Sequence, residues 1–582
     1  MKELMIGNEA LARGLFEGGC RVVSAYPGTP STEITEYIAT YDGIYSEWAP
    51  NEKVALEVAF GASLAGARAA CAMKHVGLNV AADPLFTLSY TGVTGGLVLC
   101  VADDPAMHSS QNEQDSRHYA VAAKVPLLEP ADSAECYRFA KEAFALSERF
   151  DTPVLLRTCT RIAHSQSLVE TGERAEVPLR PYVKNPQKYV MVPGNAKQRH
   201  PVVEARMAAL AEYAEDCPYN RVERGGSEVG IITAGTCYQY VKEALGETVS
   251  VLKLGLIHPL PTKLIRDFAA SVRRLVVVEE LDGIIEQHCR NLGLSVEGKS
   301  LFSPIGEYSQ ATVRRVFGLP APASLSVDTP LPVRPPVMCA GCPHRGMFYL
   351  LSKLGATVIG DIGCYTLGSQ APLSALDATL CMGASISGLH GFLHADPQVA
   401  RKTACVIGDS TFMHSGMTGL ANIAYNGSAA TVIILDNSIT GMTGHQHNPT
   451  TGYNIKGDPA GKIDLEALCR AMGIRRVRVV DPYQLKETEA VLREELAADE
   501  PSVVIARRPC VLLKSVSPKP ALRVDPGVCT GCRRCMKIGC PAISMRGDKP
   551  KQHSSIDGTL CVGCEVCVQL CAFGAIGKEA QA

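Results

Sequence analysis

Cysteines concentrate near the C-terminal end of this 582-residue chain, where eight of its 23 cysteines fall between Cys529 and Cys571. They form two runs, Cys529-x2-Cys532-x2-Cys535-x4-Cys540 and Cys561-x2-Cys564-x2-Cys567-x3-Cys571. Two-residue spacings let three thiolates converge on one iron–sulfur cubane, and the fourth cysteine of each run can reach a second cluster beside it. The runs therefore predict two [4Fe–4S] clusters. The first set is Cys529, Cys532, Cys535 and Cys571, and the second is Cys540, Cys561, Cys564 and Cys567.

Zinc sites and unliganded thiols are the alternatives to iron–sulfur ligation. Zinc sites normally use two separated pairs of ligands, whereas each run here is a tandem triplet followed by one cysteine. A disulfide framework is the weaker interpretation, because the number of cysteines is odd. Glu3, Asn8 and Glu9 interrupt the apolar run that a signal peptide needs. We therefore expect a cytoplasmic protein whose thiols stay reduced.

The composition excludes several classes of protein. Hydrophobic residues make up 46% of the chain and charged residues 20%, which is typical of soluble globular proteins. At ~150 residues per domain, the length corresponds to roughly four domains. A net charge of −2 argues against a nucleic-acid partner. The longest apolar runs, such as residues 429–435, are far shorter than the ~20 residues needed to cross a bilayer, so no membrane partner is expected.

A second group of polar residues lies at the ends of two predicted strands. Residues 408–410 read Gly-Asp-Ser, and about 28 residues later residues 436 and 437 read Asp-Asn. Carboxylate, amide and carbonyl oxygens suit Mg²⁺, and small residues let the backbone approach phosphate groups. Two turns of an ordinary doubly wound sheet are the alternative. The residues expected to hold Mg²⁺ and a diphosphate are Gly408, Asp409, Ser410, Asn437 and Ile439, the last through its backbone carbonyl.

This pair of turns resembles a degenerate thiamine diphosphate motif, with Ser410 in place of a glycine and Asp436 in place of an asparagine. Thiamine enzymes also need a carboxylate against the pyrimidine ring, which helps to remove the C2 proton. Glu52, at the start of a helix predicted over residues 52–70, is the candidate, although an acidic residue in a first helical turn can be a simple helix-dipole partner. Glu57 is the second choice. His75 is a candidate for lining the thiamine pocket, or a satisfied turn histidine.

Strand-like and helical segments alternate along most of the chain, which predicts an α/β architecture with parallel sheets. Predicted strands include residues 21–25, 97–101 and 153–157 near the start, and 229–235 and 274–279 further on. Others cover residues 357–359, 403–407, 430–435 and 502–506. We expect domains at 1–175, 226–320, 338–515 and 520–582, with a linker at 176–225 that contains some helix near 203–215, and a Pro-rich connector at 321–337.

Together these features resemble the 2-oxoacid:ferredoxin oxidoreductases, and within them most closely the large subunit of the members that oxidise indolepyruvate. The resemblance spans nearly the whole chain. It implies a pyrimidine-binding thiamine diphosphate domain at 1–175, a transketolase C-terminal-like domain at 226–320 and a diphosphate-binding domain at 338–515. The segment 520–582 resembles a bacterial-type 2[4Fe–4S] ferredoxin. The matching segments are residues 26–31 (YPGTPS), 51–55 (NEKVA), 338–344 (MCAGCPH), 360–364 (GDIGC), 408–410 (GDS) and the cysteine runs.

The resemblance also implies an activity, which is the coenzyme A-dependent oxidative decarboxylation of aryl 2-oxoacids such as indolepyruvate, with electrons passing to ferredoxin. By the same resemblance Thr29 contacts the substrate. The small gamma-type domain of the family is not found in this chain, which implies a separate smaller subunit in a heterodimer or heterotetramer. A third [4Fe–4S] cluster close to thiamine is implied, with a zinc site or a packed cysteine pair as alternatives. Its expected ligands are Cys339, Cys342, Cys364 and Cys510.

Two other functions compete with this interpretation. A non-oxidative thiamine-dependent decarboxylase or carboligase needs no net exit of electrons, so the cysteine runs argue against it. An electron-transfer scaffold subunit with a decayed thiamine site is consistent with the two departures at Ser410 and Asp436.

Overall fold

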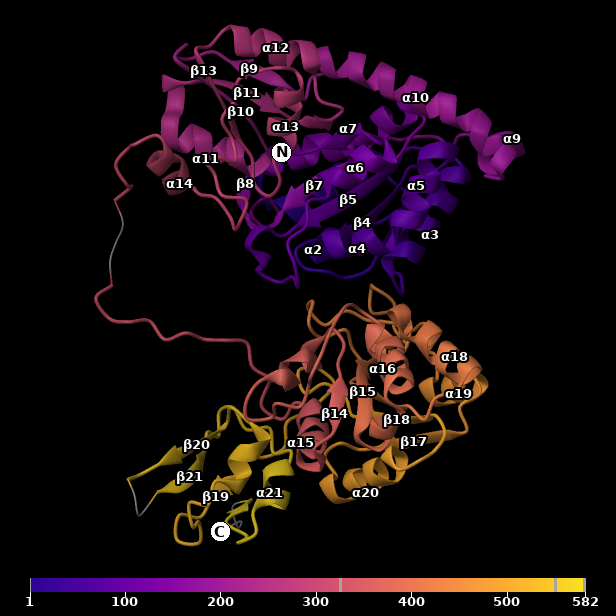
Figure 1. The fold of residues 1–582 in the computed structure, drawn as a ribbon, viewed down its shortest axis with the longest axis vertical. Helices are drawn as coiled ribbons and strands as arrows, with labels where there is room; N and C mark the ends of the chain where they lie inside the picture. Colours follow the sequence, from indigo (N-terminus) through magenta and orange to yellow (C-terminus); the bar gives the residue numbers. More distant parts are fainter. Residues whose placement is uncertain (1, 324–326, 549–551, 579–582) are drawn as a thin grey trace. The chain divides into compact units, whose positions relative to one another are not determined.

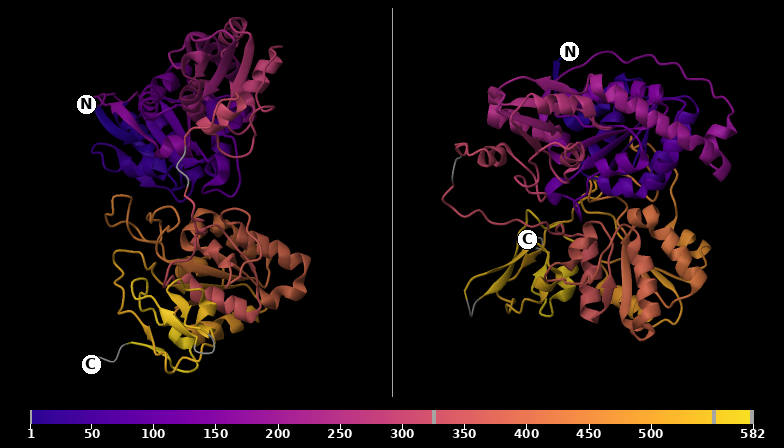
Figure 2. Two further views of the ribbon diagram at one scale, coloured as in Figure 1. Left: turned by 90° about the vertical axis from the view of Figure 1, so that its left-hand side faces the viewer. Right: turned by 45° about the horizontal axis from the view of Figure 1, so that its top comes forward.

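The computed structural model describes residues 2–323, 327–548 and 552–578. The chain divides into two compact units, Met1–Asp328 and Thr329–Ala582. The expected Pro-rich connector therefore falls across the division, and its residues 324–326 lie outside the described residues. Residues 549–551 and 579–582 of the expected ferredoxin-like segment are also outside them. Figures 1 and 2 show that each unit contains its own sheets and helices.

The first sheet of the N-terminal unit has the strand order β12-β6-β7-β5-β4-β2-β3. Its pairs are parallel, except that β12 runs antiparallel to β6. The strands predicted at 21–25, 97–101 and 153–157 are confirmed as β2, β5 and β7. The strands are β2 (Val22–Ala25), β3 (Tyr45–Trp48), β4 (Ala69–Lys74), β5 (Leu97–Asp103), β6 (Leu127–Leu128), β7 (Val154–Cys159) and β12 (Leu256–His258).

The prediction of one helix over residues 52–70 is wrong. Helix α3 covers Glu52–Leu64, and Ala69–Lys74 forms the buried strand β4 between β2 and β5. Alanine has the highest helix propensity, so this Ala-rich segment resembles a helix in sequence. The side chains of this segment instead alternate between the two faces of the sheet, as they do in a strand. Cys71 and Met73 pack into one core, and Ala70 and Ala72 pack into the core on the opposite face.

Helices cover both faces of this sheet, which is why its central strands β4, β5 and β7 are buried along their whole length. Helices α1, α2 and α7 contribute to one core, and α3 and α5 to the other. A small antiparallel pair, β1 (Lys2–Ile6) and β8 (Gln166–Glu170), joins the two ends of this region. The helices are α1 (Gly7–Glu17), α2 (Thr32–Ile38), α3, α4 (His75–Val80), α5 (Ala82–Thr91), α6 (Arg117–Ala123), α7 (Ser133–Phe150) and α8 (Thr160–His164).

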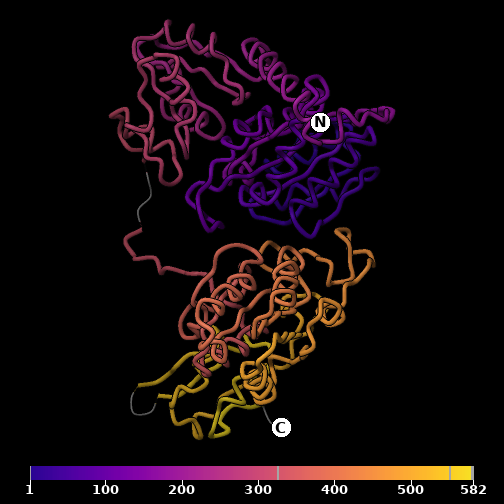
Figure 3. The backbone as a smooth tube through the Cα atoms, turned by 45° about the vertical axis from the view of Figure 1, so that its right-hand side comes forward, coloured from indigo at the N-terminus to yellow at the C-terminus, as the bar shows by residue number. Residues whose placement is uncertain are grey.

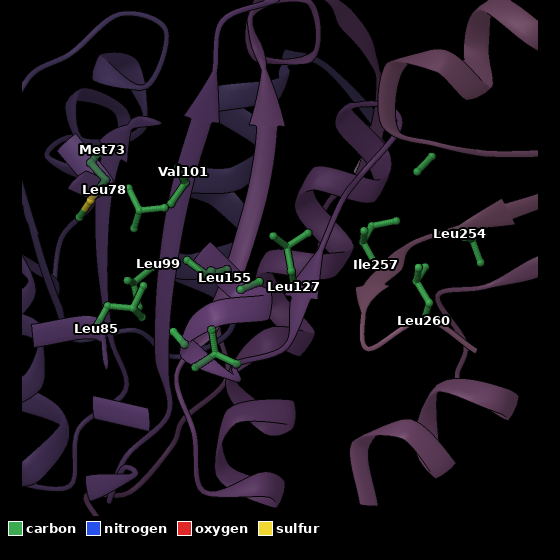
Figure 4. Packing of buried hydrophobic residues seen from close by; sticks show 14 of the residues in the cluster. Met73, Leu78, Leu85, Leu99, Val101, Leu127, Leu155, Leu254, Ile257 and Leu260 are labelled. Carbon is green, nitrogen blue, oxygen red and sulfur yellow. The ribbon is translucent and has the colours of Figure 1, made fainter. Parts of the chain in front are cut away.

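A second sheet in this unit has the order β13-β10-β11-β9. It shares a core with the first sheet, because Leu99, Leu127 and Leu155 belong to the same cluster as Leu254 of the second sheet (Figure 4). The range expected as a linker contributes β9, α9 and the long helix α10. The elements are β9 (Arg221–Glu223), β10 (Val229–Ala234), β11 (Ser250–Leu254), β13 (Arg274–Val278), α9 (Pro186–Tyr189), α10 (Pro193–Asp216), α11 (Gly235–Leu245), α12 (Thr262–Ala270), α13 (Ile284–Asn291) and α14 (Gln310–Val316).

The C-terminal unit is built on a parallel sheet with the order β14-β15-β16-β18-β17. The strands predicted at 357–359, 403–407, 430–435 and 502–506 are confirmed. The elements are β14 (Thr357–Ile359), β15 (Thr403–Gly408), β16 (Thr431–Asp436), β17 (Arg476–Val480), β18 (Ser502–Arg507), α15 (His344–Leu354), α16 (Ala384–Ala395), α17 (Asp409–Thr411), α18 (Met417–Asn426), α19 (Leu465–Ala471) and α20 (Leu485–Leu496).

The tail of this unit, yellow in Figure 3, consists of two short antiparallel pairs, β19–β22 and β20–β21, and the helix α21. It packs on the parallel-sheet part, because Met347 and Phe348 of α15 share one apolar cluster with Ile538 and Val566. No helix among the described residues is both long and apolar enough to cross a membrane. The tail elements are β19 (Arg523–Val524), β20 (Ile543–Arg546), β21 (His553–Ile556), β22 (Ile576–Gly577), α21 (Val566–Leu570) and the 3-10 helix η6 (Arg534–Ile538).

Candidate active site and cysteine centres

The predicted pyrimidine-side residues lie at one edge of the first sheet. Thr29 follows β2, Glu52 follows β3 and His75 follows β4. Strand β2 pairs in parallel with both β3 and β4, so the carboxyl ends of all three strands meet at the same edge. The fold therefore brings these three residues to one edge, although the first and the last of them are 46 positions apart in the sequence.

Glu52 is held at the start of α3, where only 5% of its surface is exposed. The side chain of Asn51 caps the helix by accepting a hydrogen bond of 2.9 Å from the amide of Val54. The backbone of α4 lies directly against the Glu52 carboxylate, because a Cβ atom on Gly77 would come 2.5 Å from its Oε1. Glu57 is on the exposed face of α3 and pairs with Lys53, so it does not share this environment.

Lys74 is a residue of this edge that the sequence reasoning missed. It is 8% exposed, its Nζ donates to the carbonyl of Ser109 at 3.0 Å, and its side chain runs along Gly28. Burial lowers the pKa of Lys74 to about 8, while the charges of Asp104 and Glu52 act in the opposite direction. Lysine is mostly a surface residue, and only its position between a buried strand and His75 could have suggested a role.

His75 and Thr29 complete the edge. His75 is 1% exposed, its Nε2 lies 3.3 Å from the carbonyl oxygen of Asn112, and its Nδ1 has no partner among the described residues. Burial lowers the pKa of His75, so the ring is neutral at neutral pH. Thr29 is half-buried, and its carbonyl accepts a hydrogen bond of 3.1 Å from the Ser109 hydroxyl.

In the C-terminal unit, three oxygen atoms of the predicted metal site converge. Strands β15 and β16 are parallel neighbours, so Asp409 and Asn437 leave the sheet side by side. The side-chain oxygen of Asn437 lies 3.1 Å from Asp409 Oδ1 and 2.7 Å from the carbonyl oxygen of Ile439. Turning the Asn437 amide over would let its NH₂ group donate to both oxygens. A divalent cation among the three oxygens would satisfy them in the present orientation, so the donor set fits Mg²⁺.

Asp409 is 2% exposed and lies close to a second carboxylate. Burial raises the pKa of Asp409 to about 7, and the charge of Asp436 adds to the shift. Asp436 is partly neutralised by Arg507, whose Nε lies 2.8 Å from Oδ2. Asp409 accepts one hydrogen bond of 3.0 Å from Thr450. A buried carboxylate without a cation of its own is costly, and a bound metal ion would remove that cost.

Gly408 and Ser410 flank Asp409. The structure gives a packing reason for Gly408, because a Cβ atom there would come 2.7 Å from the Tyr365 ring. Ser410, the residue that departs from the thiamine motif, accepts a hydrogen bond of 2.8 Å from the hydroxyl of Thr440. The serine therefore joins the loop after β16 to the turn that carries Asp409.

The four cysteines of the predicted third cluster come together beside this turn. Burial raises the pKa of Cys364 to about 11, and the charges of Cys510 and Cys339 add to the shift. Cys339 and Cys364 act in the same way on the pKa of Cys342. The amide of Cys510 donates to the carbonyl of Asn437 at 2.9 Å, which links this set to the candidate metal site.

The eight tail cysteines line two cavities. One cavity is lined by Cys529, Cys532, Cys535 and Cys571, and the other by Cys540, Cys561, Cys564 and Cys567 together with Cys342. Each cavity thus combines three cysteines of one run with the last cysteine of the other run. Backbone amides point at several of the sulfurs, as they do at iron–sulfur ligands. The donors are Ser554 to Cys529 (3.4 Å), Leu522 to Cys561 (3.4 Å) and Ala575 to Cys571 (3.3 Å).

Known proteins resemble this chain over both of these regions and over its full length. The family model "Pyruvate flavodoxin/ferredoxin oxidoreductase, thiamine diP-bdg" matches residues 13–220, and "Thiamine pyrophosphate enzyme, C-terminal TPP binding domain" matches residues 361–506. The indolepyruvate oxidoreductase subunit IorA of Archaeoglobus fulgidus is 41% identical, over 94% of this chain and 93% of that protein. The chain belongs to the indolepyruvate oxidoreductase subunit IorA family.

Other members of the IorA family are similarly close. The subunit of Pyrococcus horikoshii is 40% identical over 93% of this chain and 92% of its own, and that of Methanothermobacter marburgensis is 41% identical over the same shares. A solved 2-oxoglutarate:ferredoxin oxidoreductase from Magnetococcus marinus covers 55% of this chain and 65% of its own, at 19% identity and a TM-score of 0.46, too distant to support an inference. Family membership confirms the resemblance expected from the sequence.

The contact between α4 and Glu52 makes a prediction about Gly77. Replacing Gly77 by alanine places a methyl group against the Glu52 carboxylate, and we expect a loss of about 1–3 kcal/mol of stability from overpacking. Gly61→Ala in α3 is the control, because a Cβ atom there meets nothing within 4 Å and alanine favours a helix by about 0.5–1 kcal/mol. Chemical denaturation followed by fluorescence of Trp48, the one tryptophan in the chain, measures both. Equal stability of the two variants would contradict the contact.

Proposed function

We propose that this chain catalyses the thiamine diphosphate-dependent oxidative decarboxylation of aryl 2-oxoacids such as indolepyruvate, with coenzyme A as acyl acceptor and ferredoxin as electron acceptor. The proposal depends mainly on one observation. Cys339, Cys342, Cys364 and Cys510 influence one another's pKa values, and Cys510 is hydrogen-bonded to Asn437 of the candidate metal site. A redox centre next to a thiamine site is useful only if electrons leave the substrate. The names of the full-length relatives support the same reaction.

The two groups of predicted residues, one in each unit, have separate tasks in this proposal. Asp409, Asn437 and the carbonyl of Ile439 would hold Mg²⁺ and with it the diphosphate. Glu52 would hold a proton at its carboxylate against the pyrimidine ring. When bound, thiamine diphosphate supplies a carbon nucleophile for the keto group of the substrate. Lys74 places positive charge at the same sheet edge as Thr29, which favours an anionic 2-oxoacid there.

The cysteine sets are arranged in series within the C-terminal unit. The set of Cys339, Cys342, Cys364 and Cys510 contacts Asn437 through Cys510. Its member Cys342 also lines the cavity of the four tail cysteines Cys540, Cys561, Cys564 and Cys567. In the other tail set, the charge of Cys535 influences the pKa of Cys567, which burial raises to about 12. We propose three [4Fe–4S] clusters in this order, with the tail as a two-cluster ferredoxin domain that delivers electrons to external ferredoxin.

The rival functions fit the structure less well. A non-oxidative decarboxylase or carboligase leaves twelve cysteines in three groups without a purpose. A scaffold with a decayed thiamine site gives no role to the buried Asp409 carboxylate, whose pKa burial raises to about 7 and which a divalent cation would stabilise. We further propose that a separate smaller subunit completes the enzyme, in a heterodimer or heterotetramer, and that the enzyme works in the cytoplasm, where its thiols stay reduced.

The substrate class can be tested directly. In the presence of the smaller subunit, coenzyme A-dependent reduction of a viologen dye should proceed with indolepyruvate at roughly tenfold or higher kcat/KM than with 2-oxoglutarate. The purified complex should be assayed with and without coenzyme A over a panel of 2-oxoacids. Decarboxylation that is independent of both coenzyme A and the dye would favour the non-oxidative alternative.

Glu52 and Glu57 provide a matched pair, because both lie on α3 but only Glu52 is buried at the sheet edge. Glu52→Gln should lower kcat by about 10²- to 10⁴-fold, since the amide cannot exchange the proton that the carboxylate holds. Its iron content and stability should stay unchanged. Glu57→Gln should retain full activity. Full turnover by the Glu52 variant would show that another group does this work.

Iron analysis distinguishes two clusters from three. The holoenzyme should contain about twelve iron atoms per chain, four for each cluster. Cys510→Ser should lose about four of them. Cys381→Ser should keep all twelve, because Cys381 is exposed and belongs to none of the three sets. A wild-type content near eight would exclude the third cluster, and zinc in its place would support a structural metal site.

A further inference from the structure

Arg345 joins two of the cysteine sets through the backbone. It lies at the second position of α15, three residues after Cys342, and is 4% exposed. Its Nε donates to the carbonyl of Cys339 at 2.9 Å, and one terminal nitrogen donates to the carbonyl of Met338. The other terminal nitrogen donates to the carbonyls of Ile538 and Gly539, at 3.2 and 2.5 Å. One guanidinium thus connects the turn at 339–342 to the backbone just before Cys540.

The charge of Arg345 is not paired with a carboxylate in the part of the chain that the structure describes. Its guanidinium instead lines the cavity of the tail set that contains Cys540 and Cys564. Burial lowers the pKa of Arg345, and the thiols of Cys342, Cys540, Cys339 and Cys564 act in the opposite direction. The buried arginines Arg117 and Arg157 of the N-terminal unit, by contrast, contact carboxylates at 2.6 Å.

An unpaired buried cation costs several kcal/mol unless an anion compensates for it. Four thiolates around a [4Fe–4S] core carry net negative charge, and one such group on either side of Arg345 would supply that compensation. Positive charge and hydrogen bonding near a cluster make its reduction more favourable. A planar guanidinium also fixes several carbonyl groups at once, which the single ammonium group of lysine does less rigidly.

The turn at 339–342 also touches a second loop of the same tail set, the one at 561–564. Gly341 lies between Cys339 and Cys342, and Val562 lies between Cys561 and Cys564. A Cβ atom on Gly341 would come 2.1 Å from Val562 Cγ2, and Gly341 has φ +67°, so glycine alone allows this approach. The hydroxyl of Tyr483 donates to the carbonyl of Gly341, and the amide side chain of Gln569 in α21 donates to the carbonyl of Tyr483 at 2.7 Å.

We propose that Arg345 is a positioning residue for electron transfer between the cluster of Cys339, Cys342, Cys364 and Cys510 and the cluster of Cys540, Cys561, Cys564 and Cys567. One electron leaves the first cluster, which is oxidised, and arrives at the second, which is reduced, and no bond or proton changes. The guanidinium holds the two ligand loops at a fixed separation, and its charge favours the reduced form of both clusters. The inference rests on the clusters of the proposed function.

The test compares three variants of the holoenzyme with its smaller subunit. Arg345→Gln removes the charge, and Arg345→Lys keeps it with fewer donors. Arg478→Gln is the control, because Arg478 lies on β17 and pairs with the Glu494 and Glu495 carboxylates. Iron content, the reduction potential of each cluster from titrations followed by electron paramagnetic resonance, and the rate of viologen reduction are measured for each.

Arg345→Gln should shift the reduction equilibrium of the two adjacent clusters at least tenfold toward the oxidised form, which is about 59 mV for one electron. The cluster of Cys529, Cys532, Cys535 and Cys571 should stay unchanged, as should all clusters in Arg478→Gln. Arg345→Lys should restore the potentials but reduce dye at least tenfold more slowly than wild type, with full iron content. Comparison of the two variants separates the effect of the positive charge at position 345 from the effect of the hydrogen bonds that the guanidinium makes.

The outcomes that would overturn the inference are distinct from failure of the proposed function. Clusters present in Arg345→Gln with unchanged potentials and an unchanged rate would overturn it. Loss of iron from Arg345→Gln, together with wild-type potentials and rate in Arg345→Lys, would reduce Arg345 to a structural role. A wild-type enzyme with no iron–sulfur signal would instead contradict the proposed function, and with it the inference.

Discussion

The close approach of two cysteine loops constrains much of the C-terminal unit. The turn at 339–342 begins the parallel-sheet part, and the loop at 561–564 belongs to the tail, yet Gly341 and Val562 are in van der Waals contact. This approach requires a residue without a Cβ atom at position 341. It also requires the tail to be docked rather than tethered, which the shared apolar cluster of Met347, Ile538 and Val566 achieves. Electron transfer falls steeply with distance, so this docking supports the proposed transfer between the cysteine sets.

The same unit also contains many groups that are, or can become, negatively charged. Asp409 and Asp436 lie side by side at the ends of neighbouring strands, and the same unit contains the twelve cysteines of the three sets. The counter-charges are few and specific. Arg507 pairs with Asp436, and Arg345 lies between two of the cysteine sets. The remaining charge at Asp409 fits a divalent cation. The parallel pairing of β15 and β16 places the two carboxylates at the same edge of the sheet. The same pairing also brings together the oxygen atoms that one cation could bind.

Much of the fold could be predicted from the sequence because buried parallel strands are short, apolar and bounded by turns. Strands β5, β7, β14, β15, β16 and β18 were recognisable in this way. Strand β4 was not, since three of its six residues are alanine and helix propensity favours the wrong state. The range 176–225 resembles a linker in composition, but α10 packs against α5 through the Arg206 side chain, which donates to the carbonyl of Ser89 at 2.7 Å. Tertiary packing overrides local preference at β4, whereas the helix expected near 203–215 is confirmed as part of the longer α10.

By itself, the sequence determined the chemistry that is local in the chain. Cysteine spacing of two residues dictates three thiolates on one face, and Gly-Asp followed by Asn after the next strand dictates oxygen donors at one sheet edge. The tertiary structure alone decided which distant groups meet. Lys74 and Arg345 carry no motif, and their roles follow from burial beside carboxylates, thiols and carbonyls that come from other segments. The spacing of neighbouring residues is set by the covalent chain, whereas the surroundings of a charged side chain depend on how segments distant in the sequence pack together.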